Sequence, residues 1–119
     1  GDGSLLMNLG SLVTIANAAP TNLIHFVCEN GCYEVNGGHP IPGQGHLSFA
    51  DMAQAAGYRS VHEFDELVSF EERIADVLQE KGPVFVDLKV EQGEVYPQDF
   101  DRIHDPQMRE AFGAALRAS

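Results

Sequence analysis

Cysteine and basic residues are scarce in this sequence, and each shortage excludes a class of protein. The two cysteines are too few for a disulfide scaffold, so we expect a reducing, cytoplasmic location. Only 7 Lys and Arg residues stand against 18 Asp and Glu residues, and the net charge of −11 argues against nucleic acid and anionic membranes as partners. No apolar run approaches the roughly 18 residues of a membrane span, so we expect no membrane segment.

The 119 residues suffice for one domain, and the first of them predict a helix followed by a strand. Apolar residues recur at helical spacing from Leu5 to Ala16, with Ser4 as the expected N-cap and Pro20 beyond the helix end. The nearly continuous apolar run at 22–29 predicts a parallel strand that is buried on both faces.

The remaining sequence continues this alternation after a Gly- and Pro-rich loop at 30–46, whose length is typical of functional loops. Ser48 is the expected cap of the next helix, Ser69 forms a capping box with Glu72, and Asp105 caps the last helix. Helices are expected at 48–58, 69–82 and 107–118, and strands at 59–64 and 83–91.

The alternation predicts a three-layer α/β/α sandwich around a mostly parallel sheet. We expect a single domain over residues 1–119, with residues 94–119 as a C-terminal extension that contains a helix. In such folds a Gly-rich turn that opens a helix normally follows a strand. We therefore expect the chain to be truncated at its N-terminus, without its first strand, and Asp2 to be poorly fixed as a result.

Two short segments carry the candidate chemistry: Gly1-Asp2-Gly3-Ser4 and Glu29-Asn30-Gly31-Cys32-Tyr33, with Asn30 standing 28 residues after Asp2. Both lie where the carboxyl ends of parallel strands bind ligands. A helix N-terminus behind small glycines offers N–H groups to a phosphate. A carboxylate and a side-chain amide supply the oxygen ligands that Mg²⁺ shares with substrate phosphates.

This pair of segments resembles the motif of thiamine-diphosphate-dependent enzymes, in which Gly-Asp-Gly is followed at a similar distance by Asn-Asn-x-x-Tyr. The second segment fits, with Glu29 in place of the first Asn. The resemblance extends to about Gln92 and implies the thiamine diphosphate-binding fold, with thiamine diphosphate and Mg²⁺ as cofactors.

The resemblance also implies individual roles. Asp2, the side chain of Asn30 and the backbone carbonyl of Cys32 would bind the metal, while Gly3 and Ser4 would contact the diphosphate. The implied cofactor-binding residues are Gly1, Asp2, Gly3, Ser4, Asn30, Cys32 and Tyr33.

Within the superfamily, the opening stretch is most similar to decarboxylases of 3-sulfopyruvate and phosphonopyruvate. This similarity implies a carboxy-lyase for a small 2-oxo acid, in which a pyrimidine-binding domain or subunit supplies the glutamate that activates the cofactor. No residue here matches that glutamate, so we expect a homo- or hetero-oligomer and no turnover by this chain alone. The alternatives are an acetolactate-synthase-like carboligase half and a non-catalytic relic or regulatory module of the same fold.

The catalytic residues are not identified by sequence, although two loop histidines are candidates. His39 and His46 flank a Pro- and Gly-rich turn, and histidine titrates near neutral pH. The alternative is a lid or subunit-contact loop without proton transfer. Arg59 is the only cation between Gly1 and Phe64, so we expect the cations that recognise an anionic substrate to belong to the partner.

Overall fold

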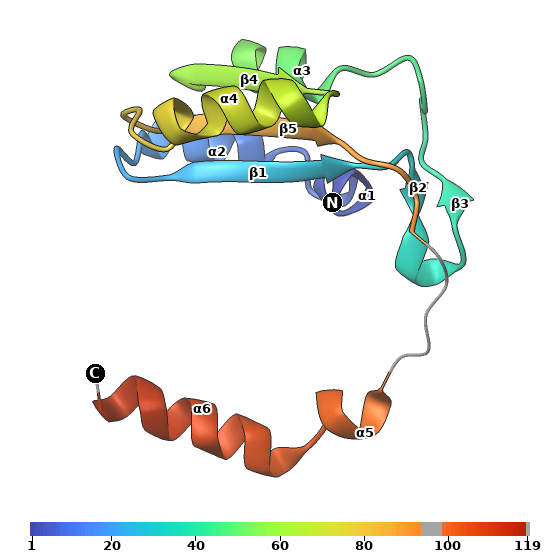
Figure 1. The fold of residues 1–119 in the computed structure, drawn as a ribbon, viewed down its shortest axis with the longest axis vertical. Helices are drawn as coiled ribbons and strands as arrows, with labels where there is room; N and C mark the ends of the chain where they lie inside the picture. The colour runs from blue at the N-terminus through green and yellow to red at the C-terminus, as the bar shows by residue number, and fades with distance from the viewer. Residues whose placement is uncertain (94–98, 119) are drawn as a thin grey trace.

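The computed structural model describes residues 1–93 and 99–118, and its centre is a sheet of three parallel strands in the order β1-β5-β4 (Figure 1). These strands are β1 (Ile24–Glu29), β5 (Val84–Lys89) and β4 (Ser60–Phe64). The central strand β5 pairs with both neighbours, so Asp87 lies opposite Val27 on one side and Glu63 on the other.

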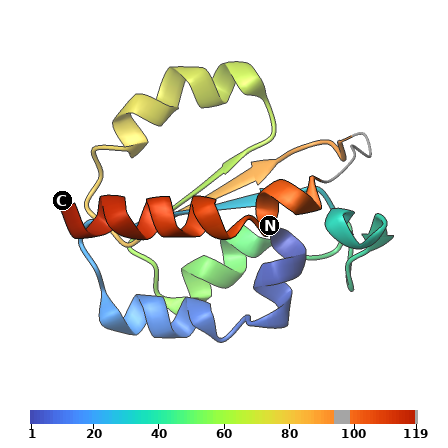
Figure 2. The same cartoon turned by 90° about the horizontal axis from the view of Figure 1, so that it is seen from below.

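Helices cover both faces of the sheet, as Figure 2 shows. One face carries α1 (Asp2–Met7), α2 (Ser11–Ala18) and α3 (Phe49–Ala56), and the other carries α4 (Leu67–Val77). Each interface has its own apolar core; the first includes Leu5, Leu12, Phe49 and Phe85, and the second includes Phe64, Val77, Val84 and Val86. The predicted three-layer α/β/α sandwich with a mostly parallel sheet is confirmed.

The helix expected near the N-terminus is divided in two. Gly1, and not Ser4, is the N-cap of α1, so Ser4 lies inside the first turn. The chain leaves α1 at Asn8, whose backbone angles are not helical, and α2 begins after Gly10. Asn and Gly are weak helix formers, and this pair outweighs the continuous apolar periodicity.

The expectation that residues 22–29 form a strand buried on both faces is wrong. Within the described residues β1 pairs only with β5, and on its α4 side Phe26 is 39% exposed and Cys28 is exposed. The strand buried on both faces is β5, because it lies between two neighbours and between two helix layers. Its residues Val84–Asp87 are fully buried.

The serine caps expected for α3 and α4 have different outcomes. The Ser48 Oγ accepts a hydrogen bond of 3.0 Å from the Asp51 N–H, so the predicted cap of α3 is confirmed. In α4 the N-cap is Glu66, and Ser69 instead donates from its hydroxyl to the Glu66 carbonyl at 2.8 Å. The capping box predicted there is therefore wrong, because α4 begins two residues before Ser69.

The loop at 30–46 contains short elements of its own. An antiparallel pair forms between β2 (Cys32–Tyr33) and β3 (His39–Pro40), with the 3₁₀-turn η1 (Glu34–Asn36) between them. The Ile41 N–H donates to the Gly31 carbonyl and closes this small hairpin against the end of β1. The long loop is thus a folded hairpin followed by a turn-rich stretch.

Beyond the sheet, α5 (Phe100–Ile103) and α6 (Pro106–Ala118) lie apart from the sheet and its helices (Figure 1). The Asp105 side chain accepts from the Gln107 N–H at 2.9 Å, so the predicted cap and helix are present. None of the described side chains of α6 is buried. The predicted start of the C-terminal extension, residue 94, lies outside the described residues.

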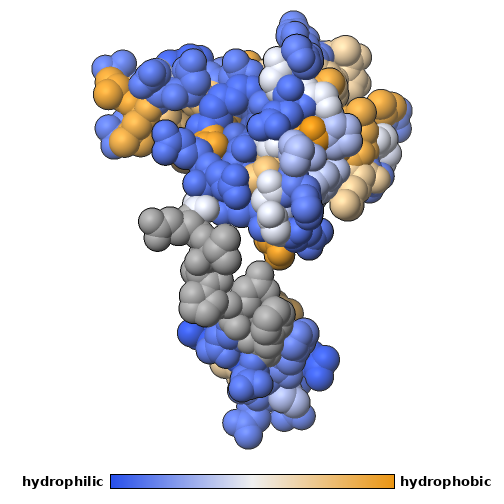
Figure 3. All heavy atoms as spheres, turned by 90° about the vertical axis from the view of Figure 1, so that its right-hand side faces the viewer, coloured by the Kyte–Doolittle hydropathy of each residue, from blue (hydrophilic) through white to orange (hydrophobic). Residues whose placement is uncertain are grey.

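The face of the molecule that contains the hairpin is mostly hydrophilic, as Figure 3 shows, in keeping with the acidic composition. In the described part of the chain, no helix is long and apolar enough to cross a membrane.

Candidate functional site

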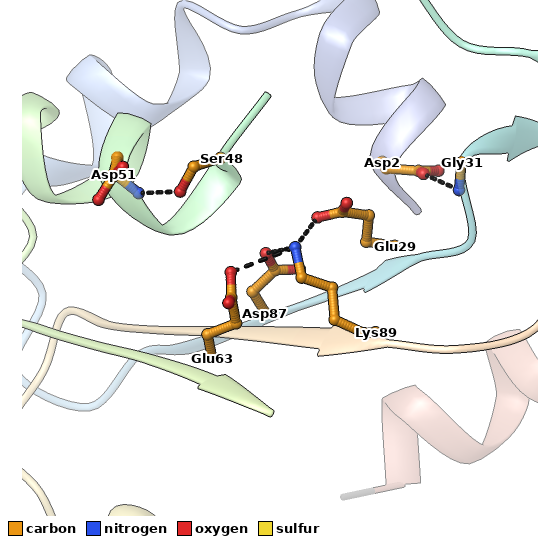
Figure 4. Close-up of polar contacts among 8 residues, drawn as sticks. All are labelled: Asp2, Glu29, Gly31, Ser48, Asp51, Glu63, Asp87 and Lys89. Atoms are coloured by element: carbon orange, nitrogen blue, oxygen red, sulfur yellow. Dashed lines mark hydrogen bonds and ion pairs between the residues drawn. The ribbon is translucent and has the colours of Figure 1, made fainter. Parts of the chain in front are cut away.

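Asp2 joins the two halves of the sequence motif. Its side chain is 2% exposed, and its two carboxylate oxygens accept hydrogen bonds of 2.7 Å from the backbone N–H groups of Gly3 and Gly31. The contact with Gly31 is visible in Figure 4. The structure therefore differs from the expectation of a poorly fixed Asp2, because the loop after β1 holds its carboxylate in place.

Asn30 directly follows β1 and is held on both sides of its amide group. Its Nδ2 donates to Glu34 Oε2 at 2.6 Å, and its Oδ1 accepts from the Cys32 N–H at 3.0 Å. The Cys32 thiol also lies 3.4 Å from Oδ1. The amide oxygen is thus directed toward Cys32 and the amide nitrogen toward Glu34.

A cavity of about 320 Å³ lies between the start of α1 and the hairpin after β1. This volume is at the lower end of the range for small-molecule sites. His39 and His46 do not line it. All seven sequence-predicted cofactor residues do: Gly1, Asp2, Gly3, Ser4, Asn30, Cys32 and Tyr33.

Gly3 allows the two halves of the motif to approach closely. A Cβ atom at this position would lie 2.6 Å from two carbons of the Tyr33 ring, a separation that side chains do not adopt. The glycine therefore makes room for the ring of Tyr33 against α1, in addition to leaving its backbone open toward the cavity.

Comparison with known proteins shows the family of this chain. Residues 1–88 match the family described as thiamine pyrophosphate enzyme, C-terminal TPP binding domain. The chain belongs to this family. The cavity at the start of α1 therefore lies in a thiamine pyrophosphate-binding domain, where the sequence motif predicts the cofactor.

Similar curated proteins are decarboxylases. Phosphonopyruvate decarboxylase of Streptomyces viridochromogenes is 39% identical over 93 residues, which are 78% of this chain and 23% of the relative. Sulfopyruvate decarboxylase subunit beta of Methanothermobacter thermautotrophicus is 34% identical over 124 aligned residues, which cover 96% of this chain and 60% of the relative. The chain thus spans between 23% and 60% of the length of these relatives.

A second polar cluster lies in this thiamine pyrophosphate-binding domain at the carboxyl ends of the three strands (Figure 4). The Lys89 ammonium lies 2.5 Å from Glu29, at the end of β1, and 3.2 Å from both Glu63 of β4 and Asp87 of β5. Burial alone would lower the pKa of Lys89, but hydrogen bonds to Glu29, Glu63 and Asp87 raise it. Lys89 is therefore a fixed positive charge.

Asp87 is the most deeply placed acid of this cluster. It is fully buried, and its Oδ1 has no hydrogen-bond partner among the described residues. Burial raises the pKa of Asp87 to about 7, although the contact with Lys89 opposes this shift. Desolvation thus favours the protonated form of Asp87, while the attraction of Lys89 favours the carboxylate.

The Cys32 thiol is buried close to two acidic side chains. Burial raises its pKa, and the nearby charges of Glu34 and Asp2 raise it further. The backbone carbonyl of Cys32 does not titrate, and its oxygen is the group of this residue that suits a hard cation.

Sequence reasoning missed Glu34 and the second polar cluster, here called the Lys89 cluster, which consists of Glu29, Glu63, Asp87 and Lys89. Glu34 gives no signal in the sequence, because it belongs to no motif. Its two partners, Asn30 and Gly93, come from distant parts of the chain and meet at Glu34 only in the folded protein. The Lys89 cluster left a signal that could have been used. Glu29, Glu63 and Asp87 each stand near the end of an expected parallel strand, and such ends share one edge of the sheet.

Proposed function

We propose that this chain is the metal- and diphosphate-binding half of a thiamine-diphosphate-dependent decarboxylase of the sulfopyruvate or phosphonopyruvate type. The observation that carries the proposal is that Asp2, Asn30 and Cys32 line one cavity in a domain of the thiamine pyrophosphate family. The similarity to both kinds of decarboxylase supports the substrate class, a 2-oxo acid with a second, strongly acidic group.

The donor set fits a hard divalent cation. Asp2 offers a carboxylate, Asn30 an amide oxygen and Cys32 a backbone carbonyl, and Mg²⁺ prefers oxygen ligands shared with phosphate groups. These residues would hold Mg²⁺, and Gly3 and Ser4 would contact the diphosphate from the start of α1. Thiamine diphosphate, when bound, supplies the electron sink for loss of carbon dioxide. The protein's part here is binding and orientation.

The anionic end of such a substrate needs cations that this cavity lacks. Its lining among the described residues includes no Arg or Lys, and Arg59 directly precedes β4, at the opposite end of the sheet. Lys89 is already paired with three carboxylates. A partner domain or subunit would therefore supply both the substrate cations and the pyrimidine-activating acid. The name subunit beta, which several relatives carry, supports a two-part assembly.

Calorimetric titration of thiamine diphosphate into the full chain, with Mg²⁺ or with EDTA, tests the proposal. We expect binding only with Mg²⁺ and a large loss in the Asn30→Ala variant, because an oxygen ligand is removed. Asn17→Ala is the matched control, since Asn17 is exposed on α2 and does not line the cavity. We also expect carbon dioxide release from either 2-oxo acid only when the partner is added.

Absence of Mg²⁺-dependent binding by the unmodified chain would contradict the proposal and favour the non-catalytic alternative. Equal Mg²⁺ dependence in the Asn30→Ala variant would show that this asparagine is not a ligand. With the partner present, a carboligation product in place of released carbon dioxide would favour the acetolactate-synthase-like alternative.

A further inference from the structure

Glu34 lies in the cavity wall and contacts two distant parts of the chain. Its Oε2 accepts the 2.6 Å hydrogen bond from Asn30 Nδ2, and its Oε1 accepts a 3.0 Å bond from the Gly93 N–H. Each carboxylate oxygen thus has its own partner. The motif that predicts the cofactor does not include this residue.

The amide of Asn30 could in principle adopt two orientations, because its oxygen and nitrogen are similar in size. An ionised carboxylate only accepts hydrogen bonds, so Glu34 pairs with Nδ2 and repels Oδ1. On the other side, the Cys32 N–H only donates, so it pairs with Oδ1. Both neighbours therefore select the same orientation.

Glu34 is itself held in position by the segment that follows β5. A Cβ atom at Gly93 would lie 2.8 Å from Glu34 Oε1, so the absence of a side chain at 93 permits this close contact. With one oxygen fixed by Gly93, the other is presented to Asn30. Charge-assisted hydrogen bonds of this kind are shorter and stronger than neutral ones.

We propose that Glu34 is a positioning residue, which fixes the amide of Asn30 so that Oδ1 and not Nδ2 faces the cation. This inference rests on the proposed role of Asn30 as a metal ligand. Without Glu34 only the Cys32 side still selects this orientation, so the flipped amide, which presents two N–H donors where the cation needs an oxygen, becomes more populated.

A double-mutant cycle in the full chain tests the inference, with Glu34→Ala, Asn30→Ala and both together. The measured quantity is the Mg²⁺ concentration that half-saturates thiamine diphosphate binding in calorimetry. We expect Glu34→Ala to raise it about tenfold, the size of one charge-assisted hydrogen bond. In the Asn30→Ala background, removing Glu34 should add nothing, since its effect passes through the amide.

A spectroscopic readout separates orientation from general stability. In the metal-free chain, the two side-chain N–H protons of Asn30 should have widely separated NMR shifts, which Glu34→Ala should bring together. Glu91→Ala is the matched control, because it removes one exposed negative charge just before Gln92 without touching the cavity. We expect it to leave the Asn30 signals and the Mg²⁺ requirement unchanged.

The outcomes distinguish this inference from the function on which it rests. No effect of Glu34→Ala alongside a strong effect of Asn30→Ala would overturn the positioning role alone. A further loss from Glu34→Ala in the Asn30→Ala background would also overturn it, because Glu34 would then act on the cation directly. No effect of Asn30→Ala would instead remove the proposed function.

Discussion

At the scale of single residues, a glycine inside α1 and the glycine that precedes α2 have opposite surroundings. A Cβ at Gly3 would lie 2.6 Å from the Tyr33 ring, whereas a Cβ at Gly10 would meet no atom within 4 Å. Gly10 also has right-handed helical angles, φ −59° and ψ −16°, which alanine adopts freely.

We therefore expect opposite effects of the same substitution. Gly3→Ala should lower the free energy of unfolding by about 1–3 kcal/mol, because the ring of Tyr33 must move. Gly10→Ala should raise it by about 0.4–1 kcal/mol, because it restricts the unfolded chain only. Urea unfolding of both variants measures the difference. Equal changes would contradict the close packing of Tyr33 on Gly3.

The site shows which residues a sequence can reveal on its own. Asp2 and Asn30 could be identified because their types and spacing form a motif, and the structure brings both to one cavity. Their roles as ligands stay predictions. Glu34 could not be identified, because it belongs to no motif and because the Gly93 N–H that holds it against Asn30 comes from 59 positions away.

At the scale of elements, local signals predicted the ranges of the three strands and two of the four expected helix caps, but not the burial of each strand in the sheet. The caps of α3 and α6 depend on one side chain and a neighbouring N–H, so they can be recognised within a few residues. The order of strands depends on contacts across the whole chain. For this reason the apolar run of β1 suggested burial on both faces, which the structure gives to β5 instead.

Two serines expected to cap helices provide an element-scale test. We expect Ser48→Ala to lower the free energy of unfolding by about 1 kcal/mol, because the Asp51 N–H loses its acceptor. Ser69→Ala should change it by less than about 0.5 kcal/mol, because Ser69 is inside α4 and caps nothing. Thermal unfolding compares the two. A larger loss at Ser69 would favour the capping box that the sequence suggested.

At the scale of the whole molecule, we propose that residues 1–93 form the cofactor-binding unit and residues 94–119 an extension. The described part of the extension contributes no buried side chain from α6. Gly93 belongs to the cofactor-binding unit, because its N–H donates a hydrogen bond to Glu34 in the cavity wall.

Two truncations test this boundary. A chain that ends at Gly93 should keep the thermal midpoint of the full chain, because its core is unchanged. A chain that ends at Glu91 should unfold several degrees lower, because Glu34 loses the Gly93 N–H and Gly38 loses its contact with Gln92. If the chain that ends at Gly93 has a lower thermal midpoint than the full chain, the removed extension stabilises the sheet.

The Lys89 cluster has a consequence for how the sheet opens. Strands β1 and β4 share no hydrogen bond, because β5 lies between them. Lys89 nevertheless contacts carboxylates from all three strands. Separating either outer strand at its carboxyl end therefore breaks an ion pair of the same ammonium group. The backbone amide hydrogens at these three strand ends should therefore exchange with solvent as one cooperative unit. This unit includes the end of β1, which directly precedes Asn30.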